Sequence, residues 1–321
     1  MAHVTLTEVL RDARQRKYGI PNLWGGSVEK VIGHVRAAEA KRSPLIMCYN
    51  HGLCPLLPVE IGVPLIVNAA RHAEVPVATI LDHGSDFQMI LKCIHHGISS
   101  VMFDGSALDY EENVRQTAEV ARIAHPLRVS VEGELGAVGG SAIETGGYSE
   151  AKSVMTDPGQ ASDFVRRTGV DALAISFGNV HGRYEGTPSL DLDRVRRIAA
   201  SVDVPLVMHG ASGLADRDYA GIIESGISKI NYYTAMAVKA AENTRQKTAQ
   251  ACKDLVCHNL MAWNIEFYIE ETNKLLDLLG CSGKAPAAAS DLNNREFDKI
   301  LVEEVSKAVR EAMSKDRFEG I

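Results

Sequence analysis

The fold of this chain is decided by a short apolar run, Ala78-Thr79-Ile80-Leu81-Asp82-His83, which ends in an aspartate and a histidine. Two later apolar runs end in the same way, residues 172–181 at His181 and residues 205–209 at His209. Short apolar runs bounded by Gly, Pro or Asp are typical of fully buried parallel strands. A side chain at the carboxyl end of such a strand points into the mouth of an α/β fold. We therefore expect the three histidines to converge at one mouth.

Working outward from this run, strand-like and helix-like segments alternate over the first 250 residues. Eight β-α units without a break in composition favour a (β/α)8 TIM barrel over an open doubly wound sheet. We assign the barrel to residues 1–252. The predicted strands lie near 18–23, 44–49, 77–82, 99–104, 128–134, 172–178, 205–209 and 228–233. The predicted helices lie near 27–41, 60–74, 86–96, 108–125, 157–168, 191–201, 216–225 and 234–252.

Residues 253–321 do not continue the repeat, and we assign them to a C-terminal helical extension of the same domain. Residues 260–279 predict a helix with an apolar face that carries Trp263, Phe267 and Ile269. A charged helix is expected from about Asn294 to Met313. Because an exposed apolar face favours association, we expect the extension to contribute to a homodimer or homotetramer contact.

Composition excludes several classes of partner. The 321 residues are 45% hydrophobic and 23% charged, which is typical of a globular protein. The net charge of -7 argues against a nucleic-acid partner. No apolar stretch reaches the roughly 18 residues of a membrane span, so we expect no membrane partner. Residues 1–16 lack the apolar core of a signal peptide, which predicts a cytoplasmic location.

Three imidazoles from three strand ends are what a catalytic zinc with an open fourth position needs, and the alternative is three unrelated core or surface histidines. Asp82, beside the first histidine, has three roles open to it on sequence alone: it could orient a ligand, act as general acid or base, or cap the next helix. Asp104, Glu132 and Glu134 end two further predicted strands and add carboxylates to the mouth. Such a cluster is costly without a cation to balance it.

Two other features of the mouth concern the substrate. The glycine-rich segment 137–149 is either a mobile lid or a plain surface loop. Small residues after the last two strands lie where barrels bind phosphate, at helix N-termini. These residues are Gly210, Ala211, Ser212 and Gly213 after one strand, and Asn231, Tyr232, Tyr233 and Thr234 after the other.

Taken together, these motifs resemble the zinc-dependent class II ketose-bisphosphate aldolases, which include the fructose- and tagatose-bisphosphate enzymes. The resemblance runs from about Tyr18 to Thr234. It is carried by residues 81–84 (LDHG), 101–106 (VMFDGS), 131–136 (VEGELG), 179–182 (NVHG), 207–213 (VMHGASG) and 229–234 (KINYYT).

The resemblance implies a function, a cofactor and a set of site residues. Zn2+ would be held by His83, His181 and His209, and Asp82 would exchange a proton with the C4 hydroxyl. A second metal position, for a divalent ion or a monovalent cation, would use Asp104 and Glu134. Substrate contacts would come from Asn22, Gly182, Gly210, Ala211, Ser212, Asn231, Tyr232, Tyr233 and Thr234. The reaction would be cleavage of a ketose 1-phosphate or bisphosphate to dihydroxyacetone phosphate and an aldehyde.

Some residues depart from the family pattern. Ser141-Ala142-Ile143 stand where acids usually follow the glycine pair, with Glu144 later, and Glu185 replaces a basic residue. A catalytically silent sugar-phosphate-binding protein of the same fold is therefore an alternative. A zinc amidohydrolase is a second alternative, although such sites use a His-x-His pair and this chain contains none.

Overall fold

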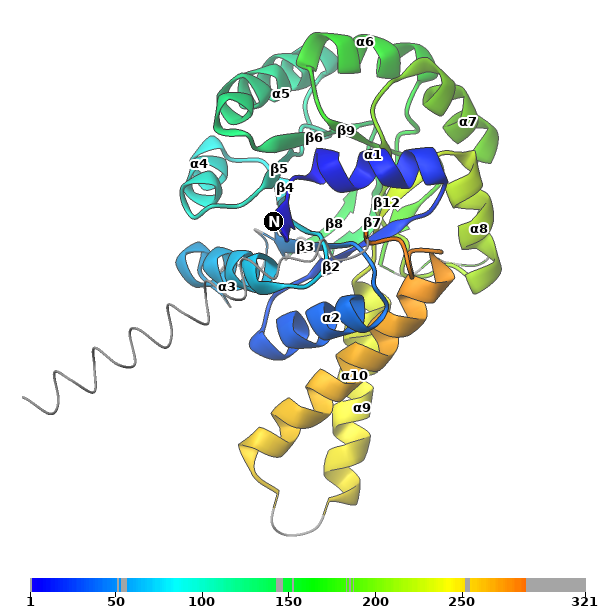
Figure 1. Ribbon diagram of the computed structural model, residues 1–321. Helices are drawn as coiled ribbons and strands as arrows, with labels where there is room; N and C mark the ends of the chain where they lie inside the picture. The colour runs from blue at the N-terminus through cyan, green and yellow to red at the C-terminus, as the bar shows by residue number, and fades with distance from the viewer. Residues whose placement is uncertain are drawn as a thin grey trace, which may run out of the picture. The chain divides into compact units, whose positions relative to one another are not determined.

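The computed structural model describes residues 2–50, 52, 57–142, 147–151, 153–182, 184, 186, 188–251 and 255–286 (Figure 1). Contacts gather Met1–Ala285 into one compact unit. The helix expected at 294–313 lies outside the described residues, as do Ile143, Glu144 and Glu185.

Eight parallel strands close into a TIM barrel, as the alternation of segments predicts. Neighbouring strands pair in the order β4-β3-β2-β12-β11-β9-β6-β5, and pairing of β5 with β4 closes the ring. The strands are β2 (Ile20–Trp24), β3 (Leu45–Asn50), β4 (Val77–Gly84), β5 (Ser100–Phe103), β6 (Ser130–Leu135), β9 (Ala172–Ile175), β11 (Leu206–Met208) and β12 (Ile227–Asn231).

Each barrel strand is followed by a helix of the outer ring (Figure 1). All eight predicted helices are present within a few residues of their expected bounds. They are α2 (Val28–Ala40), α3 (Val59–His72), α4 (Phe87–His95), α5 (Tyr110–Ala124), α6 (Pro158–Thr168), α7 (Leu192–Ser201), α8 (Asp216–Ser225) and α9 (Thr234–Gln250), with a short 3-10 turn at His125–Leu127. Side chains of Asp86, Asp109, Asp157 and Asp191 accept backbone N–H groups where α4, α5, α6 and α7 begin.

The first residues of the chain form two elements that the sequence reading does not predict, β1 (His3–Val4) and α1 (Leu6–Arg16). β1 pairs in parallel with β4, and α1 lies across one end of the barrel (Figure 1). The backbone N–H of Leu6 donates to Ser100 Oγ at 3.0 Å, and Thr7 Oγ1 lies 2.7 Å from Ser130 Oγ. Since Ser100 and Ser130 begin their strands, α1 closes the end of the barrel opposite to the mouth.

The glycine-rich segment is only partly a loop, which corrects the expectation for residues 137–149. It contains β7 (Gly139–Ala142) and β8 (Gly147–Ala151), which form a three-stranded sheet with β10 (Val180–His181). Gly140 is in register with His181 and has a φ of 115°. A Cβ at Gly140 would lie 2.3 Å from the carbonyl oxygen of His181, so this approach requires glycine.

The extension begins with α10 (Cys257–Leu278), which packs on α2 and α9. Its most buried side chains are Tyr268, Thr272, Leu275 and Leu276. Trp263, Phe267 and Ile269, the residues expected to make the buried contact, are only half-buried. Among the described residues, no helix is both long and apolar enough to cross a membrane.

Candidate active site

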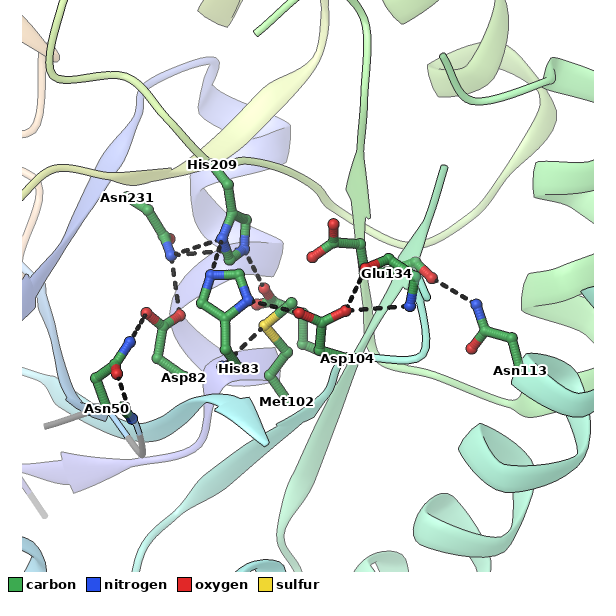
Figure 2. Close-up of polar contacts among 12 residues, drawn as sticks. Asn50, Asp82, His83, Met102, Asp104, Asn113, Glu134, His209 and Asn231 are labelled. Carbon is green, nitrogen blue, oxygen red and sulfur yellow. Dashed lines mark hydrogen bonds and ion pairs between the residues drawn. The ribbon is translucent and has the colours of Figure 1, made fainter. Parts of the chain in front are cut away.

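The site begins at an irregularity in β4. Side chains of neighbouring strand residues normally point to opposite faces, so Asp82 and His83 should not share a site. The pairing of β4 with β5 shifts between Leu81 and Gly84, and His83 has a left-handed φ of 54°. Such a bulge re-aims side chains at a strand end. It brings both Asp82 and His83 into the mouth of the barrel (Figure 2).

The three strand-end histidines do converge, as their positions predict. The ring centroid of His83 lies 4.6 Å from that of His209 and 5.2 Å from that of His181. The ring centroids of His181 and His209 are 5.8 Å apart. One ligand nitrogen from each histidine lies within 4.8 Å of the other two. All three side chains are buried. The geometry therefore places three imidazoles around one point.

Hydrogen bonds on the outer sides of two rings define which nitrogen faces that point. His83 donates through Nδ1 to Asp104 Oδ2 at 2.8 Å, which leaves Nε2 directed inward (Figure 2). His209 Nε2 lies 3.1 Å from Glu132 Oε1, so its Nδ1 faces inward, 3.0 Å from His83 Nε2. Carboxylate partners of this kind fix the orientation and tautomer of a metal-binding histidine.

Asp82 is held by amides rather than used as a helix cap. Asn231 Nδ2 donates to Asp82 Oδ1 at 2.9 Å, and Asn50 Nδ2 lies 3.5 Å from Asp82 Oδ2 (Figure 2). The cap of α4 is Asp86, whose carboxylate accepts the N–H of Gln88. The cap role for Asp82 is therefore wrong, and its carboxylate is available to the mouth.

The carboxylates divide into two groups. Asp104 and Glu134 form a second possible ligand cluster with His83, and the Oε2 atom of Glu134 is buried without a hydrogen-bond partner. Glu132 lies below the mouth rather than in it, contrary to expectation, and contacts the cluster only from beneath through His209 Nε2. It lies two residues before Glu134 on the same face of β6, roughly 6–7 Å deeper in the barrel, where it pairs with Lys229.

The pKa values of the three histidines are shifted by burial and by the charges around them. Burial alone would lower the pKa of His83, but the carboxylates of Asp82, Asp104 and Glu134 raise it to about 10. Burial and the two neighbouring imidazoles lower the pKa of His181 to about 3, and burial lowers that of His209 well below its usual value.

The acids respond to the same surroundings. Although burial opposes ionisation, the cationic surroundings of Asp82 hold its pKa below the usual range. Burial, with the charge of Asp104, raises the pKa of Glu134 well above its usual value. An added cation would balance these acids.

A small pocket opens beside Asp82. Asn22, a predicted substrate contact, lines it, and both polar atoms of its side chain are buried without a hydrogen-bond partner. Such atoms carry a cost unless a ligand or water satisfies them. The lining residues are Asn22, Trp24, Cys48, Asn50, Asp82, Asn231, Tyr232 and Tyr233.

The expected phosphate residues lie in the loops beside this pocket. Gly182 and Gly210 have positive φ angles of 82° and 69°, and a Cβ at Gly210 would lie 2.1 Å from the carbonyl oxygen of Val180. Ala211 N–H approaches Asn231 O at 3.4 Å, and Ser212 Oγ accepts the N–H of Tyr233 at 3.0 Å. Tyr232 N–H donates to the carbonyl of Asn22, and Thr234 begins α9. The N-terminus of α9, where backbone N–H groups accumulate, therefore lies next to both loops.

The sequence reading missed three residues that support the site. Asn50 ends β3 and contacts Asp82, so the strand-end criterion applied to the histidines would have found it. Tyr184 donates its hydroxyl to Gly210 O at 2.8 Å. Asn179 donates to the carbonyl oxygen of His209 at 3.0 Å. Asn179 begins the 179–182 motif, although its contact with His209 was not predicted, and no spacing signal in the sequence distinguishes Tyr184.

The residues present fit a divalent cation. Three imidazoles without thiolate are the donor set of a catalytic zinc, and the inward nitrogens of His83 and His209 are defined by their carboxylate partners. The orphaned Oε2 of Glu134 adds an oxygen donor beside His83.

Comparisons with known proteins agree with this arrangement. The family model described as fructose-bisphosphate aldolase class-II matches residues 4–284. YdjI of Escherichia coli is 40% identical over 74% of this chain and 85% of its own length. The crystal structure of that protein, titled an aldolase, has a TM-score of 0.79 and 34% identity, covering 88% of this chain and all of the other.

Two further relatives bear aldolase names. A probable fructose-bisphosphate aldolase of Bacillus subtilis is 37% identical over 78% of this chain and 87% of its own. A sulfofructosephosphate aldolase of Alkalicoccus urumqiensis is 34% identical over 89% and 99%. The barrel, its strand-end residues and these matches lead to one conclusion: the chain belongs to the class II fructose-bisphosphate aldolase family.

Proposed function

We propose that this protein is a metal-dependent aldolase that reversibly cleaves a ketose 1-phosphate or ketose bisphosphate into dihydroxyacetone phosphate and an aldehyde. The observation that carries the proposal is the placement of Asp82 beside three convergent imidazoles, with Asn231 holding its carboxylate at 2.9 Å. Family membership supports the aldolase class, whereas the metal and the substrate are inferred from the site.

His83, His181 and His209 would hold Zn2+, which when bound supplies a Lewis acid for the ketose carbonyl. Asp104 and Glu134, with His83, would hold a second cation. These assignments explain why the acids gather in a buried mouth, where an unbalanced charge is costly.

Asp82 acts on the hydroxyl of C4, the carbon that becomes the aldehyde. In the cleavage direction its carboxylate accepts the hydroxyl proton while the C4–O bond becomes a carbonyl and the C3–C4 bond breaks. The electron pair of that bond passes to C3. In the synthetic direction Asp82 returns the proton to the forming hydroxyl. The low pKa of Asp82 keeps it in the accepting form.

The remaining residues bind and orient the substrate. Gly182, the 210–212 loop and the N-terminus of α9 would receive the phosphate of dihydroxyacetone phosphate, because they offer backbone N–H groups and small side chains. Asn22 would donate to a substrate oxygen from the pocket wall. We further propose a cytoplasmic homodimer or homotetramer in which residues 253–321 extend the barrel domain and contribute to the contact.

Two measurements test this function. Zinc content of the purified protein and exchange of solvent deuterium into dihydroxyacetone phosphate should both be positive, and a chelator should abolish exchange and cleavage. Restoration by zinc is expected. A protein that binds dihydroxyacetone phosphate without exchanging its proton would be the catalytically silent alternative, and full activity without metal would refute the proposal.

A further inference from the structure

The proposed chemistry leaves one buried ion pair without a function. Lys229 of β12 and Glu132 of β6 are both fully buried, and Lys229 Nζ lies 3.0 Å from Glu132 Oε1 and 2.9 Å from Oε2. β11 and β9 stand between these two strands in the ring, so the pair spans the barrel interior. Replacing such a pair by apolar residues of similar volume is often neutral or stabilising, which makes stability a weak reason for its presence.

The pairing argues against a covalent role for the lysine. Attack on a ketose carbonyl requires the lone pair of a free amine. Lys229 instead donates to Glu132 Oε1 at 3.0 Å and forms an ion pair with Oε2 at 2.9 Å, so its nitrogen is engaged by a carboxylate. Lys229 is also the middle residue of β12, below the mouth of the barrel.

Glu132 connects the pair to the histidine cluster. The oxygen that accepts from Lys229, Oε1, also lies 3.1 Å from His209 Nε2. A carboxylate can only accept hydrogen bonds, so His209 must donate through Nε2. In the neutral ring this leaves the lone pair on Nδ1, which faces His83 Nε2 at 3.0 Å.

We propose that Glu132 and Lys229 are positioning residues that fix His209 in its Nε2–H tautomer and thereby set the affinity of the three-histidine site for its metal. Lys229 supplies the countercharge and a hydrogen bond to Oε1 that hold the carboxylate in this orientation. The opposite tautomer would place a proton at the point where the three rings meet. This inference rests on the proposed function, because it takes His209 as a ligand.

The test compares two double variants that both remove the buried charges. Glu132→Met with Lys229→Met fills the space with apolar chains and leaves His209 Nε2 without an acceptor. Glu132→Gln with Lys229→Met keeps an amide oxygen that can accept from Nε2. Zinc dissociation constants come from competition with a chromophoric chelator, and thermal unfolding checks that each variant folds.

We expect the Met/Met variant to bind zinc about 10–100-fold more weakly than the wild type. The Gln/Met variant should recover most of that loss. Equal zinc affinity in the wild type and the Met/Met variant would overturn the positioning role while leaving the proposed function intact.

A second readout needs no metal. Histidine 15N spectra of the metal-free wild type should show His209 protonated at Nε2, and the Met/Met variant should lose that single-tautomer signature. A wild type that binds zinc but shows His209 protonated at Nδ1 when metal-free would overturn the inference alone. A wild type that binds no zinc would overturn the proposed function as well.

Discussion

Asn231 donates its side-chain amide to Oδ1 of Asp82 at 2.9 Å, joining the ends of β12 and β4. The same nitrogen lies 3.2 Å from Nδ1 of His209 (Figure 2). A single amide therefore sits between the proposed acid-base group and a proposed ligand. Because Asp82 is also near Asn50, its carboxylate is oriented from two sides before substrate binds.

The first prediction concerns Asp82. If its carboxylate accepts the C4 hydroxyl proton, Asp82→Ala should lower kcat for cleavage by roughly 10²–10⁴-fold, the usual contribution of a positioned base. Asp82→Asn, which keeps the shape, should be impaired to a similar degree. Zinc content should stay near that of the wild type in both variants. Loss of metal together with activity would instead make Asp82 a support for the ligands.

The second prediction concerns the histidines. Replacing His83, His181 or His209 with alanine leaves two imidazoles, which hold zinc poorly. Each variant should lose bound zinc and aldol cleavage together, as measured by metal analysis and steady-state kinetics. His72→Ala, an exposed matched control, should change neither. A variant of the three that retained full zinc and full activity would remove that residue from the ligand set.

The third prediction is a dependence of stability on pH that arises far from the mouth. His34 Nδ1 of α2 lies 2.8 Å from Thr272 Oγ1 of α10, and burial, with the nearby Lys30, lowers its pKa to about 3. An unfolded histidine has a pKa near 6.5. As pH falls from 6.5 towards 3, the unfolded chain therefore binds a proton that the folded chain does not, and stability falls by at most about 1.4 kcal/mol for each pH unit.

His34→Gln cannot titrate, so it should flatten the loss of unfolding free energy between about pH 6.5 and pH 4.5. Denaturant titrations at several pH values measure this slope. His72→Gln, on the surface, should keep the wild-type slope. If His34→Gln also keeps it, another group controls acid stability.

The fourth prediction concerns association. Val238 of α9 and Met261 of α10 are 42% and 38% exposed, on the two helices that extend beyond the barrel (Figure 1). Met261→Lys should shift the protein towards monomer in light scattering, whereas Glu270→Lys, also exposed on α10, should not. Deleting residues after about 255 should give monomeric or aggregated protein, because it removes Tyr268 and Leu276 from the core. If Met261→Lys and the deletion both left the size of the oligomer unchanged, residues 253–321 would not contribute to the subunit contact.

The fifth prediction concerns substrate choice. The resemblance implies a basic residue at the position of Glu185, which lies outside the described residues, and acids near residues 141–143, where this chain has none. A carboxylate near a second phosphate opposes its binding, by an amount on the order of 1–3 kcal/mol in a partly closed pocket. We expect a higher kcat/KM for a ketose 1-phosphate with an uncharged distal end than for fructose 1,6-bisphosphate. The reverse order would indicate an ordinary bisphosphate aldolase.

The sequence predicts the barrel well because its signals are local. Each strand is a short apolar run with turn residues on both sides, and each helix repeats its apolar positions at helical spacing. The strand-end criterion then brings His83, His181 and His209 together without any knowledge of the pairing order. Predicting these parts of the fold requires only the direction of the chain and the polarity of neighbouring residues.

What the sequence does not predict depends on distant contacts. The bulge that aims both Asp82 and His83 inward comes from the register between β4 and β5. The depth of Glu132 and its partner Lys229 is set by the closed ring, and the strand β7 forms because β10 lies beside it. α1 is a different case, since Thr5 and Glu8 form a capping box that a search for helix starts would have detected.

The contacts of α10 and the residues after it with the first β-α unit, β2 and α2, have a consequence for biosynthesis. Gly19 N–H donates to Leu279 O at 2.9 Å, and Gly283 N–H donates to Lys41 O at 2.8 Å. A nascent chain makes β2 and α2 early, but their partners in α10 and just after it are synthesised more than 200 residues later. Contacts of such long sequence separation form slowly, and apolar surface stays exposed until they do. The buried face of α2 is therefore the surface that a chaperone would protect during translation.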